Sequence, residues 1–312
     1  MKFKEKAFSL PAILFLTLIV RIVCIFFYGD NTIDNEWKIL LINLKENNIL
    51  SIRDVNGEPV PNIFMPPLYA YFLYVIKIFF INEQAFLIAV HIIQMLISSA
   101  TVYIMYCILK NFFTKNINHL GLIIFALFPI NVYASSQISS ITLQLFLLTI
   151  YLLSFIKVFK KKKLKQSLIL ASSGALLILL RGEFFIFYIL TLIYLFFHNK
   201  DAKFFLLIFS FSLLIVSPYL VRNYLIFETI TITKSAGYNL LKGNNPISKV
   251  EGVGMFRNVG NIVPEVNLRL QELNKLGPIK KHDLLIDKIF LDQAVSFIKE
   301  DPKKYVSLYF KK

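Results

Sequence analysis

Three carboxylates stand close together just after a long apolar run. The stretch YGDNTIDNEW, residues 28–37, contains Asp30, Asp34 and Glu36. Carboxylates held at a lipid–water boundary are suited to acid–base chemistry. The alternatives are ordinary ones, because an aspartate at a helix start is often only a cap and a loop acid is often only solvated. The choice depends on which other groups lie on the same side.

Two arginines lie at the ends of apolar runs, where a positive charge near the hydrocarbon core costs free energy. Arg181 separates two apolar runs and Arg222 ends the last one. Since a cation costs about 2–3 kcal/mol at mid-bilayer and less near the surface, Arg181 needs a partner. That partner is either Glu183 or a phosphate group, which guanidinium binds in a bidentate manner. Arg222 is either a snorkelling interfacial residue or a second phosphate ligand. The role of Arg21, inside the first run, stays open.

A turn-rich stretch, residues 235–254, follows later in the chain. Asn244 and Asn245 can present amides and backbone N–H groups to an anionic ligand, with Lys242 alongside. The alternative is a loop without a ligand. His91, a lone polar residue in an apolar run, reads as a packed or hydrogen-bonded histidine and not as a metal ligand.

The composition indicates a helical integral membrane protein. The chain has 312 residues, of which 56% are hydrophobic and 17% charged, so it is more apolar than a soluble domain. The net charge of +15 points to cytoplasmic loops and anionic membrane lipids, and nucleic acid is not expected as a partner. Cys24 and Cys107 lie inside apolar runs, so no disulfide framework is expected.

Eight apolar runs mark the candidate spans: 8–28, 64–81, 85–109, 119–134, 138–156, 167–180, 184–198 and 202–221. The lysine-rich loop 157–165 and the lysines of the N-terminus predict that both are cytoplasmic. One of the first five runs must then not cross. The run 64–81 contains two prolines near its start, Pro66 and Pro67, and is assigned to a helix in the outer interface. About seven spans remain.

This layout predicts an all-α polytopic protein with two parts. Residues 1–222 form the transmembrane module, with a first outer loop at about 29–84, and residues 223–312 form an extracytoplasmic helical tail. Helical spacing of apolar residues predicts further helices at 34–48, 264–276 and 283–299. The carboxylates, Arg181, Arg222 and the tail therefore all fall on the outer side, and we expect them to share one pocket there.

Several motifs, in order along nearly the whole chain, carry a resemblance to a known family. They are DNEW, MPPLYAYFLYVI, FALFPINVYASS, ALLILLRGEFF, SPYLVRNYLIFETITITKSAGYNLLKGNNP and DPKKYVSLYFKK. Together they resemble the polyprenyl-phosphate-sugar-dependent membrane glycosyltransferases of the GT-C class, specifically bacterial relatives of the dolichyl-phosphate-mannose–protein mannosyltransferases. The resemblance implies a GT-C-like fold in the bacterial inner membrane and a part in cell envelope glycosylation.

The resemblance implies sugar transfer, hexosyl or pentosyl, from a polyprenyl-phosphate donor to an acceptor hydroxyl, outside the cytoplasm and with inversion. The acceptor is a lipid, a glycan or a protein. Asp34 is the first choice for the general base and Glu36 the second. Arg181 and Arg222 would stabilise the phosphate leaving group. The resemblance adds these further residues to the donor site: Asn223, Lys242, Asn244 and Asn245. Some relatives use a divalent metal, Mg²⁺ or Mn²⁺, for which Asp30, Asp34 and Glu36 would be the ligands.

The chain departs from the family pattern in three places. Gly182 stands where the family's arginine motif has proline, and Ser140 and Ile141 stand where many relatives have a second acid. Relatives usually continue into further spans beyond the position of Lys312, so we expect a truncated member. Two other readings remain open: a flippase or transporter for a lipid-linked sugar, and a membrane component that binds such a lipid without catalysis.

Overall fold

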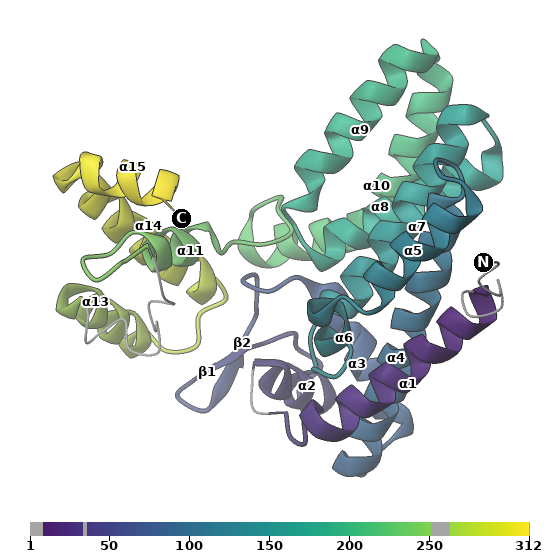
Figure 1. Ribbon diagram of the computed structural model, residues 1–312. Coiled ribbons are helices and arrows are strands. Elements are labelled where there is room, and N and C mark those ends of the chain that lie inside the picture. Colours follow the sequence, from purple (N-terminus) through teal and green to yellow (C-terminus); the bar gives the residue numbers. More distant parts are fainter. Residues whose placement is uncertain (1–8, 34–35, 251–262, 312) are drawn as a thin grey trace. The chain divides into compact units, whose positions relative to one another are not determined.

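A computed structural model describes residues 9–33, 36–250 and 263–311 of the chain. Apart from one short hairpin, the regular elements of these residues are helices (Figure 1). The chain forms two compact units: residues 1–35 with 67–218, and residues 36–66 with 219–312. Part of the first outer loop thus groups with the tail, which the sequence did not predict. Asp34 lies outside the described residues.

The first unit contains the apolar helices. Four helices are long and apolar enough to cross a membrane: α1 (Leu10–Tyr28), α4 (Glu83–Leu109), α7 (Ile141–Lys160) and α10 (Ala202–Phe227), the last of which continues into the second unit. Three apolar helices are shorter, and these are α3 (Pro67–Phe79), α8 (Leu164–Leu180) and α9 (Phe184–Asn199). Large apolar side chains of α1 and α9 are exposed, as expected for helices that face lipid. The all-α polytopic prediction is confirmed.

The run 119–134 is not one continuous helix. It divides into α5 (Lys115–Ala126) and α6 (Pro129–Ala134). Phe128 has an extended backbone, with φ −60° and ψ 118°, and Pro129 occupies the first turn of α6. A residue before proline is sterically biased away from the helical region, which explains the break. With 12 residues, α5 is about 18 Å long and too short to span the hydrocarbon core.

Arg21 holds three helices of the first unit together. Its Nε donates to Ser98 Oγ of α4 at 2.7 Å, and its Nη1 donates to the carbonyl oxygens of Thr17 in α1 and Ala126 in α5, both at 3.2 Å. The side chain is 1% exposed. The structure therefore decides the open question of its role, because Arg21 is a buried side chain that donates hydrogen bonds inside the first unit.

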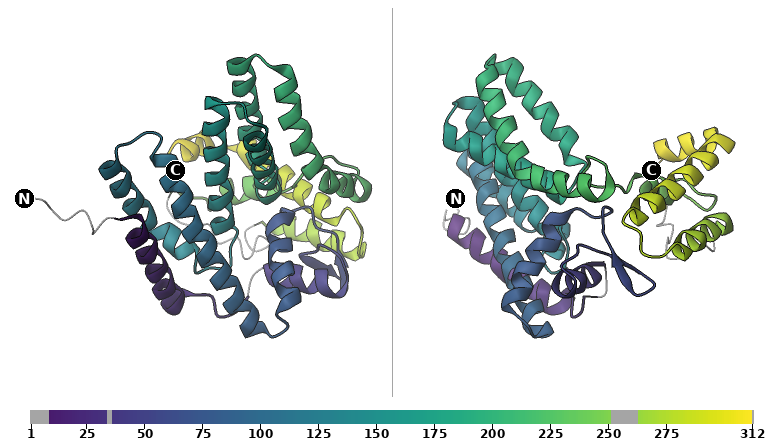
Figure 2. Two further views of the ribbon diagram at one scale, coloured as in Figure 1. Left: turned by 90° about the vertical axis from the view of Figure 1, so that its right-hand side faces the viewer. Right: turned by 180° about the vertical axis from the view of Figure 1, so that it is seen from behind.

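The helices of the first unit pack in a short series. Helix α7 packs against both α4 and α8, and α1 packs against α4. Two further views show the same neighbours (Figure 2). The C-terminal end of α8, next to Arg181, lies beside the N-terminal end of α7. Arg181, which directly follows α8, is therefore positioned by the packing of α8 against α7.

In the described residues, the second unit combines a helix and a hairpin from the first loop with helices of the tail. The elements are α2 (Glu36–Glu46), β1 (Arg53–Val55), β2 (Glu58–Val60), α11 (Ala236–Gly243), α13 (Pro264–Lys275), α14 (His282–Glu300) and α15 (Pro302–Lys311). The helices predicted at 34–48, 264–276 and 283–299 are confirmed. The antiparallel hairpin was missed, although Asn56 and Gly57 between short strands are a strong turn signal. Both adopt positive φ, 55° and 86°.

The core of the tail forms where α14 packs against α11 and α13. Its buried members are Leu241, Val263, Val266, Leu273, Ile286, Ile289, Phe290 and Ala294. Gly237 allows α11 to approach α14 closely, because a Cβ atom there would collide with the Asp287 carbonyl oxygen. The Gly237 N–H donates to Asp287 Oδ1 at 2.8 Å. The pair fixes the spacing of the two helices.

The stability of the second unit should depend on pH through His282. Burial lowers the pKa of this imidazole below its usual 6.5, and Asp283 opposes the shift. At pH values between the folded pKa and 6.5, the unfolded chain therefore binds more protons than the folded chain. The contribution of neutral His282 to the free energy of unfolding is full above pH 6.5 and is lost as the pH falls through the folded pKa. We expect the unfolding midpoint to drop as the pH falls below 6.5, and to drop less in His282→Gln.

Trp37 is the only tryptophan of the chain and lies buried in this unit, so its fluorescence measures the transition. Burial also raises the pKa of Asp283, and the neighbouring His282 opposes that shift. The difference between the two proteins therefore measures the loss of His282 together with its interaction with Asp283. Equal drops in the wild type and His282→Gln would contradict the assignment.

Candidate functional site

Asp30 is engaged in holding the end of α1. Its Oδ2 accepts a hydrogen bond from the Ile138 N–H at 2.6 Å, and its own N–H donates to the Ser136 carbonyl at 3.2 Å. The Asp30 carbonyl accepts from His91 Nε2 at 3.0 Å, which requires the proton on Nε2. The prediction of a hydrogen-bonded His91 is confirmed. The carboxylate thus ties α1 to the loop between α6 and α7.

A chain of polar side chains continues from this point through the first unit. The Tyr69 hydroxyl donates to Gln94 Oε1 at 2.9 Å, and Gln94 Nε2 donates to the Gln137 carbonyl at 2.7 Å. Gln137 Nε2 donates in turn to the Tyr28 carbonyl at 2.6 Å. Sequence reasoning missed this network, although Gln94 inside an apolar helix was a visible signal. The network makes the α1 end and the α6–α7 loop one rigid support.

Arg181 caps the C-terminal end of α8 and faces the first turn of α7. Its Nε donates to Gln144 Oε1 at 3.2 Å. Among the described residues no carboxylate forms an ion pair with it, and Glu183, the internal partner considered from the sequence, is exposed. Within the same described part, its two Nη groups make no hydrogen bond. Arg181 therefore presents an uncompensated guanidinium whose Nη groups are available to an anion.

In the described residues, the predicted metal ligands do not form a cluster. Within the described ranges, no group of three His, Cys, Asp or Glu side chains lies close enough to hold a metal ion. Of the predicted ligands, Asp30 already accepts a backbone hydrogen bond, Glu36 is exposed at the start of α2, and Asp34 is outside the described residues. Metal use stays a prediction, and no step below depends on it.

Arg222 lies in the second unit and organises the segment before Pro66. Its Nη1 donates to the Asn62 carbonyl at 2.8 Å and to Asn223 Oδ1 at 2.7 Å. The guanidinium also lies over the rings of Tyr219 and Phe227, 5.5 and 5.3 Å from their centroids. In the described part of the chain its Nε and Nη2 make no hydrogen bond. Arg222 therefore holds the Asn62 segment in place, and its Nε and Nη2 are not used by the described residues.

The segment around Asn62 is held from several sides of the second unit. The Ile63 N–H donates to Asp283 Oδ2 at 3.1 Å, and the Ile63 carbonyl accepts from the Lys234 N–H at 2.8 Å. Arg53 Nε lies 3.3 Å from Asp283 Oδ1. These bonds join the first-loop segment to the tail.

Among the remaining predicted ligands, the three asparagines form hydrogen bonds with nearby backbone carbonyls, whereas Lys242 is exposed. Asn223 is fully buried, and its Nδ2 donates to the Thr231 carbonyl at 2.6 Å. The Asn244 and Asn245 side-chain amides donate to the carbonyls of Leu240 and Leu241, which close the end of α11. Lys242 is exposed. The two asparagine amides thus cap a helix, and Lys242 is the exposed cation beside them.

Asn62→Ala should destabilise the second unit. The Asn62 Oδ1 accepts from the N–H groups of Phe64 and Met65, both at 2.9 Å, and its Nδ2 donates to the Met65 carbonyl at 3.0 Å. Losing these bonds costs about 2–3 kcal/mol, measured by denaturant unfolding with Trp37 fluorescence. The matched control is Asn47→Ala, an exposed asparagine with one side-chain bond, for which we expect under about 1 kcal/mol. Equal losses would refute the role of Asn62.

Comparison with known proteins gives one match. The family model described as dolichyl-phosphate-mannose-protein mannosyltransferase matches residues 65–221, which include the apolar helices from α3 to α9, Arg181 and most of α10. No curated protein and no solved structure matches the chain.

Proposed function

Because the chain belongs to the dolichyl-phosphate-mannose-protein mannosyltransferase family, we propose that it transfers a sugar from a polyprenyl-phosphate donor to an acceptor hydroxyl with inversion. Membership makes the chain a membrane glycosyltransferase that uses a lipid-linked sugar. The proposal adds the polyprenyl-phosphate form of the donor, a reaction on the extracytoplasmic side of the bacterial inner membrane, and a lipid, glycan or protein as acceptor.

The proposed reaction is a single displacement. The Asp34 carboxylate accepts the proton of the acceptor hydroxyl, and the hydroxyl oxygen attacks the anomeric carbon on the face opposite the phosphate. The bond between the anomeric carbon and the phosphate oxygen breaks, and its electron pair leaves on the polyprenyl phosphate. Phosphate is a good leaving group, so no general acid is required. Arg181 stabilises the negative charge that grows on it.

The state of Arg181 carries this proposal. A guanidinium in a membrane protein normally has an anionic partner, and among the described residues Arg181 has only the neutral Gln144. One Nε–H is used by that contact, which leaves the two Nη groups for a phosphate. Arg222, Lys242 and the asparagines of the second unit stay predictions, and the mechanism does not need them.

Transfer can be tested with purified protein in lipid nanodiscs. A polyprenyl-phosphate sugar with a radiolabelled sugar is added together with a crude membrane acceptor fraction, and released polyprenyl phosphate and labelled acceptor are both measured. The proposal expects both products in equal amounts. Movement of intact donor across a vesicle bilayer without bond cleavage would instead support a flippase, and binding without cleavage or movement would support a non-catalytic component.

A further inference from the structure

Three segments of the first unit carry ten lysines and one aspartate. They are 110–115 between α4 and α5, 157–165 at the junction of α7 and α8, and 199–203 at the junction of α9 and α10. We call these segments together the basic face. Its lysine side chains are all exposed, and they belong to Lys110, Lys115, Lys157, Lys160, Lys161, Lys162, Lys163, Lys165, Lys200 and Lys203.

Side-chain contacts bring the three segments of the basic face together. Lys160 Nζ donates to Asn111 Oδ1 at 2.9 Å, which joins the first segment to the second. Lys162 Nζ pairs with Asp201 Oδ2 at 3.1 Å, which joins the second segment to the third. The partners are 49 and 39 positions apart in the sequence, so it is the fold that makes one surface of the three segments.

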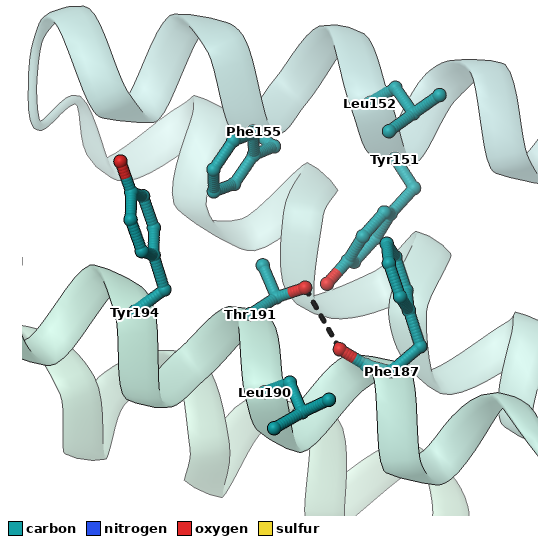
Figure 3. A pocket seen from close by; sticks show the side chains of 7 residues that line it. All are labelled: Tyr151, Leu152, Phe155, Phe187, Leu190, Thr191 and Tyr194. Atoms are coloured by element: carbon teal, nitrogen blue, oxygen red, sulfur yellow. Dashed lines mark hydrogen bonds between the residues drawn. The ribbon is translucent and has the colours of Figure 1, made fainter.

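Aromatic rings hold the ends of α7 and α9 next to each other behind the basic face. Phe159 of α7 stacks on His198 of α9 with 4.2 Å between ring centroids. One turn further along α7, Phe155 contacts Tyr194 of α9 with 6.1 Å between centroids. Figure 3 shows these two side chains in the wall of a pocket between the helices. The second and third segments are therefore positioned by packed helices.

The positive charge of the basic face is largely uncompensated. Among the described residues, Lys162 is the only one of these lysines in an ion pair, and its partner Asp201 also accepts a hydrogen bond from the Phe204 N–H at 3.1 Å. The C-terminal ends of α4, α7 and α9 and the N-terminal ends of α5, α8 and α10 meet here, so their partial charges of about half a unit each cancel. The remaining lysines thus attract an anionic partner.

The basic face lies at the ends of helices that are long enough to cross a membrane. Helices α4 and α7 end, and α10 begins, within or directly beside its segments. Exposed apolar side chains lie between the lysines, and these are Phe112, Phe113 and Leu164, which are 62%, 51% and 61% exposed. Ammonium groups beside apolar side chains at the end of a membrane span match the boundary between lipid headgroups and acyl chains. An inorganic phosphate ion would leave the apolar side chains in water, whereas a phospholipid covers both groups.

We propose that the basic face binds the headgroups of anionic phospholipids in the leaflet that it meets. Each lysine close to such a surface raises lipid affinity about fivefold, which corresponds to about 1 kcal/mol. The ammonium groups pair with lipid phosphates, and the apolar side chains lie against the upper part of the acyl chains. Helix α8 has 17 residues, so about 25 Å separates the basic face from Arg181. This lipid site is distinct from the proposed donor site and does not rest on the proposed function.

A photoreactive phosphatidylglycerol tests the lipid site in phosphatidylcholine nanodiscs. With the photoreactive group next to the headgroup, we expect the peptides that contain residues 110–115 and 157–165 to be labelled. Their labelling should be about five times that given by an equally photoreactive phosphatidylcholine. The two yields should become similar in 1 M salt, where the screening length falls to about 3 Å. Equal labelling by the two lipids at 0.1 M salt would overturn the proposal.

Substituted lysines show whether their charge causes the preference. One variant combines Lys157→Gln, Lys161→Gln, Lys163→Gln and Lys165→Gln, and we expect its preference for phosphatidylglycerol to fall from about fivefold to below about twofold. The matched control makes the same change of charge at exposed lysines of the second unit, with Lys38→Gln, Lys45→Gln, Lys275→Gln and Lys299→Gln, and should keep the preference.

The outcomes of this comparison separate the lipid site from sugar transfer. Circular dichroism checks that both variants keep the helix content of the wild type. A preference that survives in the first variant, or that is lost equally in both, would refute the basic face as the lipid site. Labelling needs no sugar donor, so a wild type that prefers phosphatidylglycerol but transfers no sugar would support the lipid site and defeat only the proposed function.

Discussion

Arg181→Ala lowers the rate of sugar transfer by about 10²–10³-fold, while the protein still inserts into the membrane. The size follows from the loss of one positioned donor group that stabilises transition-state charge. Arg181 lies at the end of α8 and contacts only the neutral Gln144, so its removal breaks no ion pair among the described residues. The measurement is initial release of polyprenyl phosphate in nanodiscs, normalised to inserted protein.

Three further variants identify the cause of that loss. Arg181→Lys keeps the charge without the bidentate geometry and should recover only part of the activity. Gln144→Leu frees the guanidinium to move and should cost several-fold, because positioning alone is affected. Arg269→Ala removes an exposed arginine that pairs with Asp292 at 3.2 Å and should leave the rate unchanged. If Arg181→Ala keeps more than about a tenth of wild-type activity, the phosphate role is excluded.

Asp34→Asn should lower kcat by about 10²–10⁴-fold, the range that a positioned general base contributes. It should also remove the acid limb of the pH–rate profile, because that limb reports ionisation of the base. Glu36→Gln should have a small effect, since Glu36 is exposed at the first turn of α2. If Glu36→Gln abolishes transfer and Asp34→Asn does not, the two acids exchange roles.

Asp30→Asn is the matched control for this experiment. An asparagine at position 30 can still accept the hydrogen bond from the Ile138 N–H through its Oδ1 and carries no charge. We expect near wild-type kcat if Asp30 only anchors the end of α1. An equal loss in Asp30→Asn and Asp34→Asn, with partial recovery on added Mg²⁺ or Mn²⁺, would replace the general-base assignment by a metal site.

The sequence by itself determined the class of protein and its element types. Long apolar runs and few charges are typical of a chain that spans a bilayer, and the motifs predicted the family whose model matches residues 65–221. The amphipathic spacing from Trp37 to Leu44 predicted α2 correctly. These features are local, so composition and periodicity record them directly.

Only the tertiary structure decided what each polar residue contacts. From the sequence, the role of Arg21 stayed open and Arg222 was a candidate phosphate ligand. In the structure, Arg21 is buried among Ser98 and two carbonyls, and Arg222 holds the Asn62 segment. Asn244 and Asn245 looked like anion ligands, and their amides cap α11. A hydrogen bond forms between groups that the fold brings together from distant positions, and such distances are not written in the spacing of residues along the chain.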